Sequence, residues 1–205
     1  MTYLTLNLLS TIELTEEQFY QICQTNRHLR IEQGAKGELL LMPERSSQAS
    51  LRNIKLWNQL YEWEISDFQK IQGTAFADSH HFRLPNGAIR CPDAAWVRVE
   101  SLRQVYGDLW EYIIDREKEN IHYLSPDLVI EFYYPYQNLQ YLQWKMQEYI
   151  ENGSSLGWLI EVEAQQVQIY RKARRVEILQ FPETLSGEFV IPGFELNTKK
   201  IFVLN

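Results

Sequence analysis

The sequence predicts an α/β fold that contains at least one pair of parallel strands. The prediction depends mainly on residues 125–163, where a strand, an amphipathic helix and a second strand follow one another closely. Two buried strands joined by a single helix pair in parallel and form a right-handed crossover. Hairpin signals elsewhere in the chain add antiparallel strands.

The first strand of this unit is expected at residues 127–133. The segment is short and apolar, and it ends before Pro135, which cannot donate a ladder hydrogen bond. Successive side chains of a strand point to opposite faces. One face should carry Leu128, Ile130 and Phe132, and the other Asp127, Val129, Glu131 and Tyr133.

A helix and a second buried strand should follow. Apolar residues recur at helical spacing at Leu139, Leu142, Met146, Tyr149 and Ile150. Gly153 then stands where a left-handed helix cap prefers glycine. Residues 156–162 are apolar again and predict the second strand.

Glu131 is the most informative residue of this unit. Burying an ionised carboxylate in an apolar strand costs several kcal/mol of hydration free energy. Either a partner of opposite charge offsets this cost, or the pKa rises and the group becomes neutral. Lys145 falls beside the apolar stripe of the helix, so its side chain can lie over the sheet. The geometry therefore allows a buried ion pair between Glu131 and Lys145.

Composition limits the class of protein. The chain has 205 residues, of which 45% are hydrophobic, and we expect a single domain over residues 1–205. A net charge of −7 disfavours strong nonspecific binding to nucleic acid or to anionic membranes, while a local basic groove stays compatible with it. Cys23 and Cys91 lack the spacing of a zinc site, so we expect free buried thiols. Without a signal-peptide pattern or an apolar run of about 18 residues, a soluble cytoplasmic protein is expected.

Two helices and a hairpin are expected in the N-terminal part of the chain. Thr15 and Gln18 have the form of a capping box, which predicts a helix from there to about His28. Residues 30–33 and 38–42 predict a hairpin. A second helix should pack an apolar stripe into the core, formed by Leu51, Ile54, Trp57, Leu60 and Tyr61.

The middle of the chain predicts strands. Residues 71–84 should supply one or two strands, and residues 89–99 should form another after a PNG turn. This last strand carries Asp93 directly after Pro92. His80 and His81 are adjacent, so on a strand they would face opposite ways, which disfavours a shared metal ion.

A hairpin with a basic turn is expected near the C-terminus. Residues 167–171 and 176–179 predict antiparallel strands around the turn RKARR, and a further short strand is expected near Phe189. A charged hairpin turn is usually solvated, so contact of this turn with nucleic acid is the weaker interpretation.

Asp93 and Glu131 together could bind a hard divalent cation. Two carboxylates on neighbouring strands offer the oxygen ligands that Mg²⁺ or Mn²⁺ prefers. Lys145 would then orient a nucleophile or stabilise the charge that develops during hydrolysis of a phosphodiester. From the residues alone, a structural alternative stays open, in which backbone N–H groups cap Asp93 and Glu131 pairs with Lys145.

Four segments, in this order and spacing, resemble the bacterial Uma-type family of proteins designated putative restriction endonucleases: GELLLMPE, FRLPNGAIRCPDAAWVRVESL, SPDLVIEF and LQWKMQEYIENGSSLGWLIEVEAQQVQIYR. The likeness extends from about Ile31 to Tyr170, and the family is placed in the PD-(D/E)XK nuclease superfamily. The resemblance implies a restriction-endonuclease-like central mixed sheet flanked by helices, and magnesium-dependent cleavage of DNA.

The resemblance also assigns roles by position. It makes Asp93 the motif aspartate, Glu131 the motif glutamate and Lys145 a motif lysine that has moved from the strand to the next helix. Asp93 and Glu131 would be the metal ligands, and all three residues would be catalytic. Tyr133 occupies the usual lysine position, and Glu38 matches an upstream acidic position, so both are candidates for a supporting role.

One segment departs from the family pattern. Where the family commonly reads E, two variable positions and then SPSD, this chain reads EFYYPYQN. Tyr134 and Tyr136 thus replace serines, and Gln137 replaces an acidic residue. The catalytic trio is kept, but hydrogen bonding at the end of the strand changes, and with it the fit of the substrate.

We expect a divalent-metal-dependent DNA endonuclease. A noncatalytic nuclease-fold module that binds nucleic acid or protein is the alternative, because the YYPYQN segment is altered and the net charge is acidic. A third hypothesis is a hydrolase that acts on another phosphoester. We also expect a homodimer, since nucleases that cut both strands often place two sites across a two-fold axis.

Overall fold

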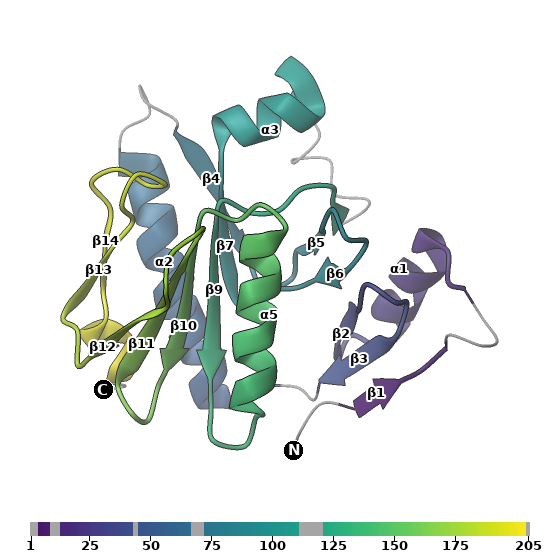
Figure 1. Ribbon diagram of the computed structural model, residues 1–205, viewed down its shortest axis with the longest axis horizontal. Coiled ribbons are helices and arrows are strands. Elements are labelled where there is room, and N and C mark those ends of the chain that lie inside the picture. The colour runs from purple at the N-terminus through teal and green to yellow at the C-terminus, as the bar shows by residue number, and fades with distance from the viewer. Residues whose placement is uncertain (1–3, 9–12, 43–44, 67–71, 111–120, 204–205) are drawn as a thin grey trace.

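The computed structural model describes residues 4–8, 13–42, 45–66, 72–110 and 121–203, and these residues form two six-stranded mixed sheets (Figure 1). The first sheet has the order β1 (Leu4–Leu6), β3 (Leu39–Met42), β2 (Arg30–Gln33), β6 (Ile89–Arg90), β5 (His81–Arg83) and β8 (Ile121–His122). The second has the order β12 (Glu177–Gln180), β11 (Gln166–Arg171), β10 (Leu156–Glu161), β9 (Leu128–Tyr133), β7 (Ala94–Arg98) and β4 (Gly73–Ala77).

The remaining elements flank the sheets. The helices are α1 (Glu16–Thr25), α2 (Ser47–Ser66), α3 (Val99–Tyr106), the 3-10 turn η1 (Gly107–Leu109), α5 (Leu139–Glu151) and α6 (Lys199–Phe202). A small two-stranded sheet joins β13 (Thr184–Ser186) to β14 (Glu195–Asn197). No helix in the described ranges is long and apolar enough to cross a membrane.

The strand–helix–strand unit is confirmed. β9 and β10 pair in parallel, with Glu131 opposite Leu159, and α5 connects them. Asn138 begins α5, because its side chain accepts a hydrogen bond from the backbone N–H of Tyr141. Figure 1 shows α5 on the near face of the second sheet, while α2 lies behind the sheet.

The predicted alternation along β9 is also confirmed. Leu128, Ile130 and Phe132 belong to the apolar cluster that includes Leu56 and Leu60 of α2. Val129 and Tyr133 instead pack in the cluster under α5. Glu131 therefore points to the α5 face, where Lys145 lies.

The N-terminal predictions hold in outline. The capping box of Thr15 and Gln18 is present, and the helix ends at Thr25 rather than near His28. The hairpin forms from β2 and β3. Cys91 is buried and Cys23 is partly buried, and both are free thiols, as expected.

The apolar face predicted for α2 was largely wrong. The helix is present, but Leu51, Ile54 and Tyr61 are 40, 56 and 42% exposed. The fully packed face is instead formed by Ala49, Asn53, Leu56 and Leu60. The helix carries two rows of side chains at helical spacing, and the periodicity alone does not reveal which row faces the sheet.

The single strand predicted for residues 89–99 was wrong, because the segment divides between the two sheets. β6 belongs to the first sheet and β7 to the second. Pro92, which has no N–H to donate, lies in the connection between them. Asp93 consequently stands where the chain passes from one sheet to the other.

Two further predictions concern strands. Residues 73–83 form β4 and β5, which confirms two strands in this segment, while residue 71 lies outside the described ranges. β11 and β12 form the predicted antiparallel pair. The strand expected near Phe189 was wrong: this segment is a turn in which the N–H of Ile191 donates to the carbonyl of Gly187.

Candidate active site

The structure brings Asp93, Glu131 and Lys145 together between β7, β9 and α5. The backbone N–H of Asp93 donates to the carbonyl of Ile130 over 3.1 Å. The backbone N–H of Phe132 donates to Asp93 Oδ2 over 2.6 Å. These two bonds fix Asp93 against the part of β9 that carries Glu131, and both carboxylates are buried.

Lys145 reaches this point from α5 and is only 1% exposed. Its Nζ lies 2.6 Å from Glu131 Oε1 and 2.6 Å from Glu32 Oε1. The ammonium thus joins β2, β9 and α5 through two ion pairs. The Glu131–Lys145 pair that the sequence allowed is present, and Lys145 also has a second carboxylate partner.

Glu32 is the site residue that the sequence analysis missed. It is fully buried, and besides Lys145 it contacts Arg90 Nη1 at 3.3 Å and the N–H of Cys91 at 3.0 Å. β2 reads RIEQ, in which Ile31 is the one apolar residue, so Glu32 lacks the apolar sequence neighbours that single out Glu131 in LVIEFY. Its burial follows from the packing of β2 against α5 and the second sheet and gives no clear signal in the sequence.

Glu38 and Tyr133 lie apart from this cluster. Glu38 stands in the turn between β2 and β3, where its carboxylate accepts a hydrogen bond from the N–H of Lys36. Tyr133 is partly buried against the apolar cluster under α5. Among the described hydrogen bonds, neither side chain contacts Asp93, Glu131 or Lys145.

Two arginines hold the other side of Asp93. Arg30 Nη1 lies 3.0 Å from Asp93 Oδ1, and Arg45 forms ion pairs with both Asp93 and Asp78. Burial alone would raise the pKa of Asp93, but Arg45, Arg30 and the N–H of Phe132 lower it to about 2. Asp93 is therefore ionised at neutral pH.

A second set of ion pairs, centred on Arg90, holds Glu32 in position. Arg90 is fully buried, and its Nε lies 2.6 Å from Glu148 Oε2 on α5. The same guanidinium lies over the ring of Trp144, 5.4 Å from its centroid. Arg90 thus connects Glu32 to α5, which fixes the carboxylate that contacts Lys145.

The two glutamates around Lys145 differ in acidity. Burial raises the pKa of Glu131 to about 7, with Lys145 opposing the rise and the charge of Asp93 adding to it. Burial also acts on Glu32, but Lys145, Arg90 and Arg30 outweigh it and lower the pKa to about 2. The pKa of Lys145 is raised despite burial, because both carboxylates stabilise the ammonium. Glu131 is therefore the group that exchanges a proton near neutral pH.

The donor chemistry of Asp93 and Glu131 fits a hard divalent cation. Mg²⁺ is often held by one or two carboxylates together with water and substrate oxygens. Within the described ranges, no three His, Cys, Asp or Glu side chains converge as a metal site. Asp93 and Glu131 would be the two protein ligands, and the cation would compete with Arg30 and Arg45 for Asp93.

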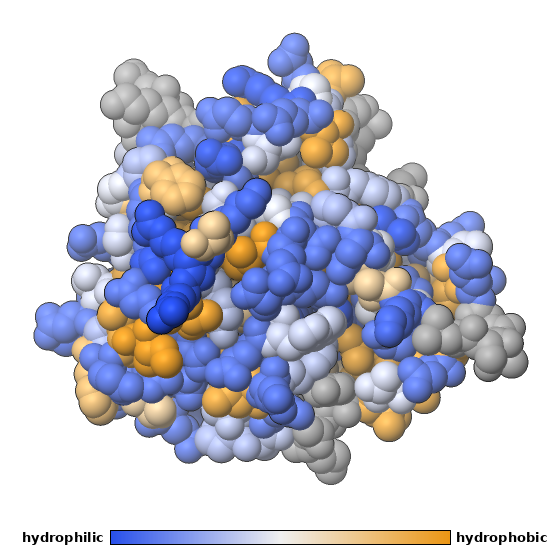
Figure 2. All heavy atoms as spheres, in the orientation of Figure 1, coloured by the Kyte–Doolittle hydropathy of each residue, from blue (hydrophilic) through white to orange (hydrophobic). Residues whose placement is uncertain are grey.

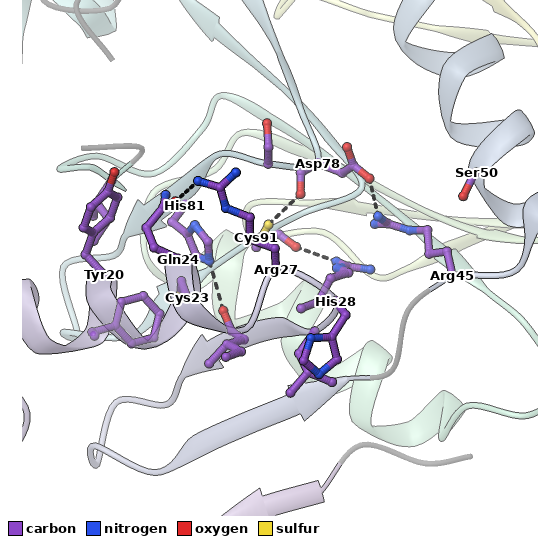
Figure 3. A pocket seen from close by; sticks show the side chains of 16 residues that line it. Tyr20, Cys23, Gln24, Arg27, His28, Arg45, Ser50, Asp78, His81 and Cys91 are labelled. Carbon is purple, nitrogen blue, oxygen red and sulfur yellow. Dashed lines mark hydrogen bonds and ion pairs between the residues drawn. The ribbon is translucent and has the colours of Figure 1, made fainter. Parts of the chain in front are cut away.

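A cavity of about 530 Å³ lies close to the ionic cluster, although Asp93, Glu131 and Lys145 do not themselves line it (Figure 3). Arg30 and Arg45, which bind Asp93, both line it. Figure 3 shows Arg27 next to Gln24 on the α1 side of the view, with Arg45 on the opposite side. Three arginines therefore border the cavity, Arg27, Arg30 and Arg45, together with Asp78, the carboxylate partner of Arg45.

The adjacent histidines have different partners. His80 Nδ1 lies 3.1 Å from His122 Nε2, whereas His81 Nε2 lies 2.9 Å from the carbonyl oxygen of Ile31. Burial lowers the pKa of His122 to about 3, so this ring is neutral at pH 7. The two histidines thus belong to the packing of the first sheet.

The sequence matches the model of the Uma2 family, described as "Putative restriction endonuclease", over residues 16–199. The chain belongs to the Uma2 family. This confirms the resemblance found in the sequence. No curated protein sequence matches the chain.

A solved structure has the same fold as this Uma2-family chain. It is the crystal structure titled a "putative nuclease belonging to DUF820" from Anabaena variabilis ATCC 29413. The TM-score is 0.71 at 18% sequence identity, and the match covers 92% of this chain and 97% of the other. At this identity the likeness shows the fold, a mixed α/β architecture with helices flanking the sheets.

Proposed function

We propose that this chain is a divalent-metal-dependent endonuclease that hydrolyses phosphodiester bonds of DNA. The observation that carries the proposal is the buried contact of Lys145 with Glu131, 2.6 Å long, directly beside Asp93. Two carboxylates that can bind a metal ion, with an ammonium group next to them, provide the activation of water and the charge stabilisation that phosphodiester hydrolysis requires. Membership of the Uma2 family, described as "Putative restriction endonuclease", supports the same reaction class.

Each residue has a distinct role in this proposal. Asp93 and Glu131 would hold Mg²⁺ or Mn²⁺, which when bound supplies a more acidic water and neutralises charge on the phosphate. Glu131, with a pKa of about 7, would release its proton as the metal enters. Lys145 keeps its proton and would donate hydrogen bonds to the attacking or developing oxygen charge. Glu32 is a positioning residue, because it holds the Lys145 ammonium in place.

Arg30 and Arg45 would bind the DNA backbone. Each is 15% exposed and borders the cavity while it pairs with Asp93. A guanidinium group has five N–H donors, so each arginine can bind a phosphate in the cavity while it still contacts Asp93, and a cation on Asp93 would free further donors. This local basic surface is how a chain of net charge −7 can still bind DNA.

A noncatalytic module is the second candidate. Arg30, Arg45 and Lys145 already neutralise Asp93, Glu131 and Glu32, so the charges are balanced by the chain's own residues. A balanced buried network is also what a purely structural ionic core contains.

Calorimetric titration with Mg²⁺ and Mn²⁺ tests the two candidates. The enzyme predicts binding in the millimolar range or tighter, with release of up to about one proton per metal near pH 6.5 and loss of binding in Asp93→Ala. Absence of metal binding, together with absence of cleavage of plasmid and single-stranded DNA, would exclude the enzyme and leave the noncatalytic module.

We also propose that the chain forms a homodimer, as in nucleases that cut two strands with two symmetric sites. Exposed apolar side chains are available for an interface, including Ile178 and Phe181, which are 55 and 68% exposed. Figure 2 shows an apolar patch at the lower left, in the region where Figure 1 places β11 and β12. A monomeric mass in light scattering at micromolar protein would contradict the dimer.

A further inference from the structure

Tyr134 and Tyr136 form a stacked pair directly after β9. Their ring centroids lie 5.6 Å apart and their planes differ by 4°. Tyr134 is partly buried against the main apolar cluster, whereas Tyr136 is 46% exposed. One tyrosine therefore supports the other and leaves the outer ring accessible to a ligand.

The turn that carries this pair is fixed by two hydrogen bonds. The N–H of Tyr134 donates to the side-chain oxygen of Gln137 over 2.8 Å, and the N–H of Gln137 donates to the carbonyl of Tyr134 over 2.8 Å. Two residues earlier, the N–H of Phe132 binds Asp93. The stacked pair of Tyr134 and Tyr136, here called the platform, and the Asp93 carboxylate are thus both held at the C-terminal end of β9.

The charges of the site reach the platform. Burial and the charge of Asp93 raise the pKa of Tyr136, while Arg45 and Arg30 lower it. Figure 1 shows the turn after β9 and the first turn of α2, which follows Arg45 in the chain, at the same end of the second sheet. An exposed aromatic face and two guanidinium groups therefore share one end of the site.

This combination suits one chemical class of ligand. Aromatic rings bind unpaired nucleobases by stacking, and guanidinium groups bind the phosphates that connect them. A paired base inside a duplex already stacks on its neighbours and presents no free face. A peptide would use the aromatic face but would not explain a pair of arginines suited to phosphate, and a phospholipid, which has a phosphate, offers no flat ring to stack on Tyr136.

We propose that Tyr136, backed by Tyr134, stacks an unpaired base of the nucleic-acid strand whose phosphate enters the Asp93 site. The substrate class is then single-stranded or locally unpaired DNA. This inference rests on the proposed function for the identity of the scissile phosphate, but the stacking itself requires no catalysis.

Binding of fluorescent DNA in EDTA tests the platform without turnover. The probes are a short single strand that contains 2-aminopurine and a fully complementary duplex of matched sequence. The wild type should quench the 2-aminopurine and bind the single strand at least about tenfold more tightly than the duplex. Tyr136→Ala should lower single-strand affinity by about tenfold and abolish quenching, while Tyr136→Phe, which keeps the ring, should match the wild type.

Tyr61→Ala is the matched control. Tyr61 is 42% exposed and stacks on Trp57, with centroids 4.9 Å apart, but it lies on α2 away from the ionic cluster. The Tyr61→Ala variant should bind both probes with the affinity of the wild type. The platform is contradicted if Tyr136→Ala binds the single strand like the wild type, if the duplex binds equally well, or if neither probe binds.

These experiments distinguish failure of the platform from failure of the proposed nuclease function. If single-strand binding depends on Tyr136 but Mg²⁺ and Mn²⁺ promote no cleavage, the nuclease proposal fails and the platform stands. If metal-dependent cleavage occurs but Tyr136→Ala changes neither binding nor the preference for single strands, the platform fails and the nuclease stands.

Discussion

Glu131 and Glu32 contact the same ammonium, yet their pKa values move in opposite directions. Glu32 is surrounded by Lys145, Arg90 and the N–H of Cys91, so its ionised form is well compensated. Glu131 has Lys145 and, at 3.4 Å, the hydroxyl of Tyr149, while the like charge of Asp93 opposes its ionisation. The difference makes Glu131 the exchangeable carboxylate and Glu32 the permanent one.

The first prediction concerns the pH dependence of stability. Because the pKa of Glu131 rises from 4.5 to about 7 on folding, the folded state binds more protons between these values, and this group makes stability fall as pH rises through them. The loss should be on the order of 2–3 kcal/mol by pH 8. Urea unfolding of wild type and Glu131→Gln from pH 4.5 to 8 measures it.

The difference in stability between the wild type and Glu131→Gln isolates the contribution of Glu131 from those of other titrating groups, such as His122. Glu131→Gln should equal the wild type near pH 4.5 and equal or exceed it at pH 8, since Lys145 keeps Glu32 as a partner. Parallel pH curves for the two proteins would show that Glu131 does not carry the predicted proton.

The second prediction concerns Glu32. Glu32→Gln removes a compensated charge and leaves the buried Arg90 and Lys145 with one partner fewer, so it should destabilise the metal-free protein by about 3–5 kcal/mol. Chemical denaturation at pH 7 measures the change, with Glu131→Gln as the matched variant. A cost for Glu32→Gln no larger than that for Glu131→Gln would contradict the assigned roles.

At the scale of elements, the site depends on close pairing within the second sheet. β4 pairs with β7, the strand that begins after Asp93, and Gly73 lies opposite Arg98. A Cβ atom at Gly73 would lie 2.4 Å from the carbonyl oxygen of Val97 and 2.6 Å from the Trp96 ring. Backbone atoms of a central strand cannot move aside easily, so only glycine fits here.

The third prediction follows from this contact. Gly73→Ala should destabilise the protein by about 3 kcal/mol or more, because β4 has to separate from β7. Gly157→Ala is the comparison: its closest contact is the flexible end of Met146, at 2.5 Å, which can rotate away. Thermal unfolding of the two variants should rank Gly73→Ala as the more damaging, and the reverse order would contradict the packing described.

The sequence reveals the elements with strong periodic signals. β9, α5 and β10 follow from apolar spacing, and the contact of Glu131 with Lys145 follows from their faces. The division between β6 and β7 does not, because a short connection containing Pro92 resembles an irregular point in one strand. The buried face of α2 and the role of Glu32 depend on which elements pack together, and that information is tertiary.

At the scale of the whole molecule, the charge is distributed unevenly. The net charge is −7, yet Arg27, Arg30 and Arg45 gather at the cavity close to the ionic cluster. Long-range attraction to DNA should therefore be weak, and short-range contacts at the cavity should dominate.

The fourth prediction concerns the salt dependence of this binding. If about three arginines contact phosphates, log K for a single strand should fall with log salt with a slope of about −2. Fluorescence anisotropy across a salt series in EDTA gives the slope. A slope steeper than about −5 would indicate an extended phosphate tract that the cavity does not provide.

The central claim is that Asp93, Glu131 and Lys145 hydrolyse DNA with a divalent metal. The direct measurement is cleavage of plasmid and single-stranded DNA in Mg²⁺, Mn²⁺ or EDTA by the wild type and Asp93→Asn. Asp108→Asn, which changes an exposed carboxylate of η1, is purified identically to control for contaminating nucleases. Metal-dependent cleavage by the wild type and Asp108→Asn, reduced at least about 100-fold in Asp93→Asn, is the expected result. Equal cleavage by all three proteins, or none by the wild type with either metal, would contradict the claim.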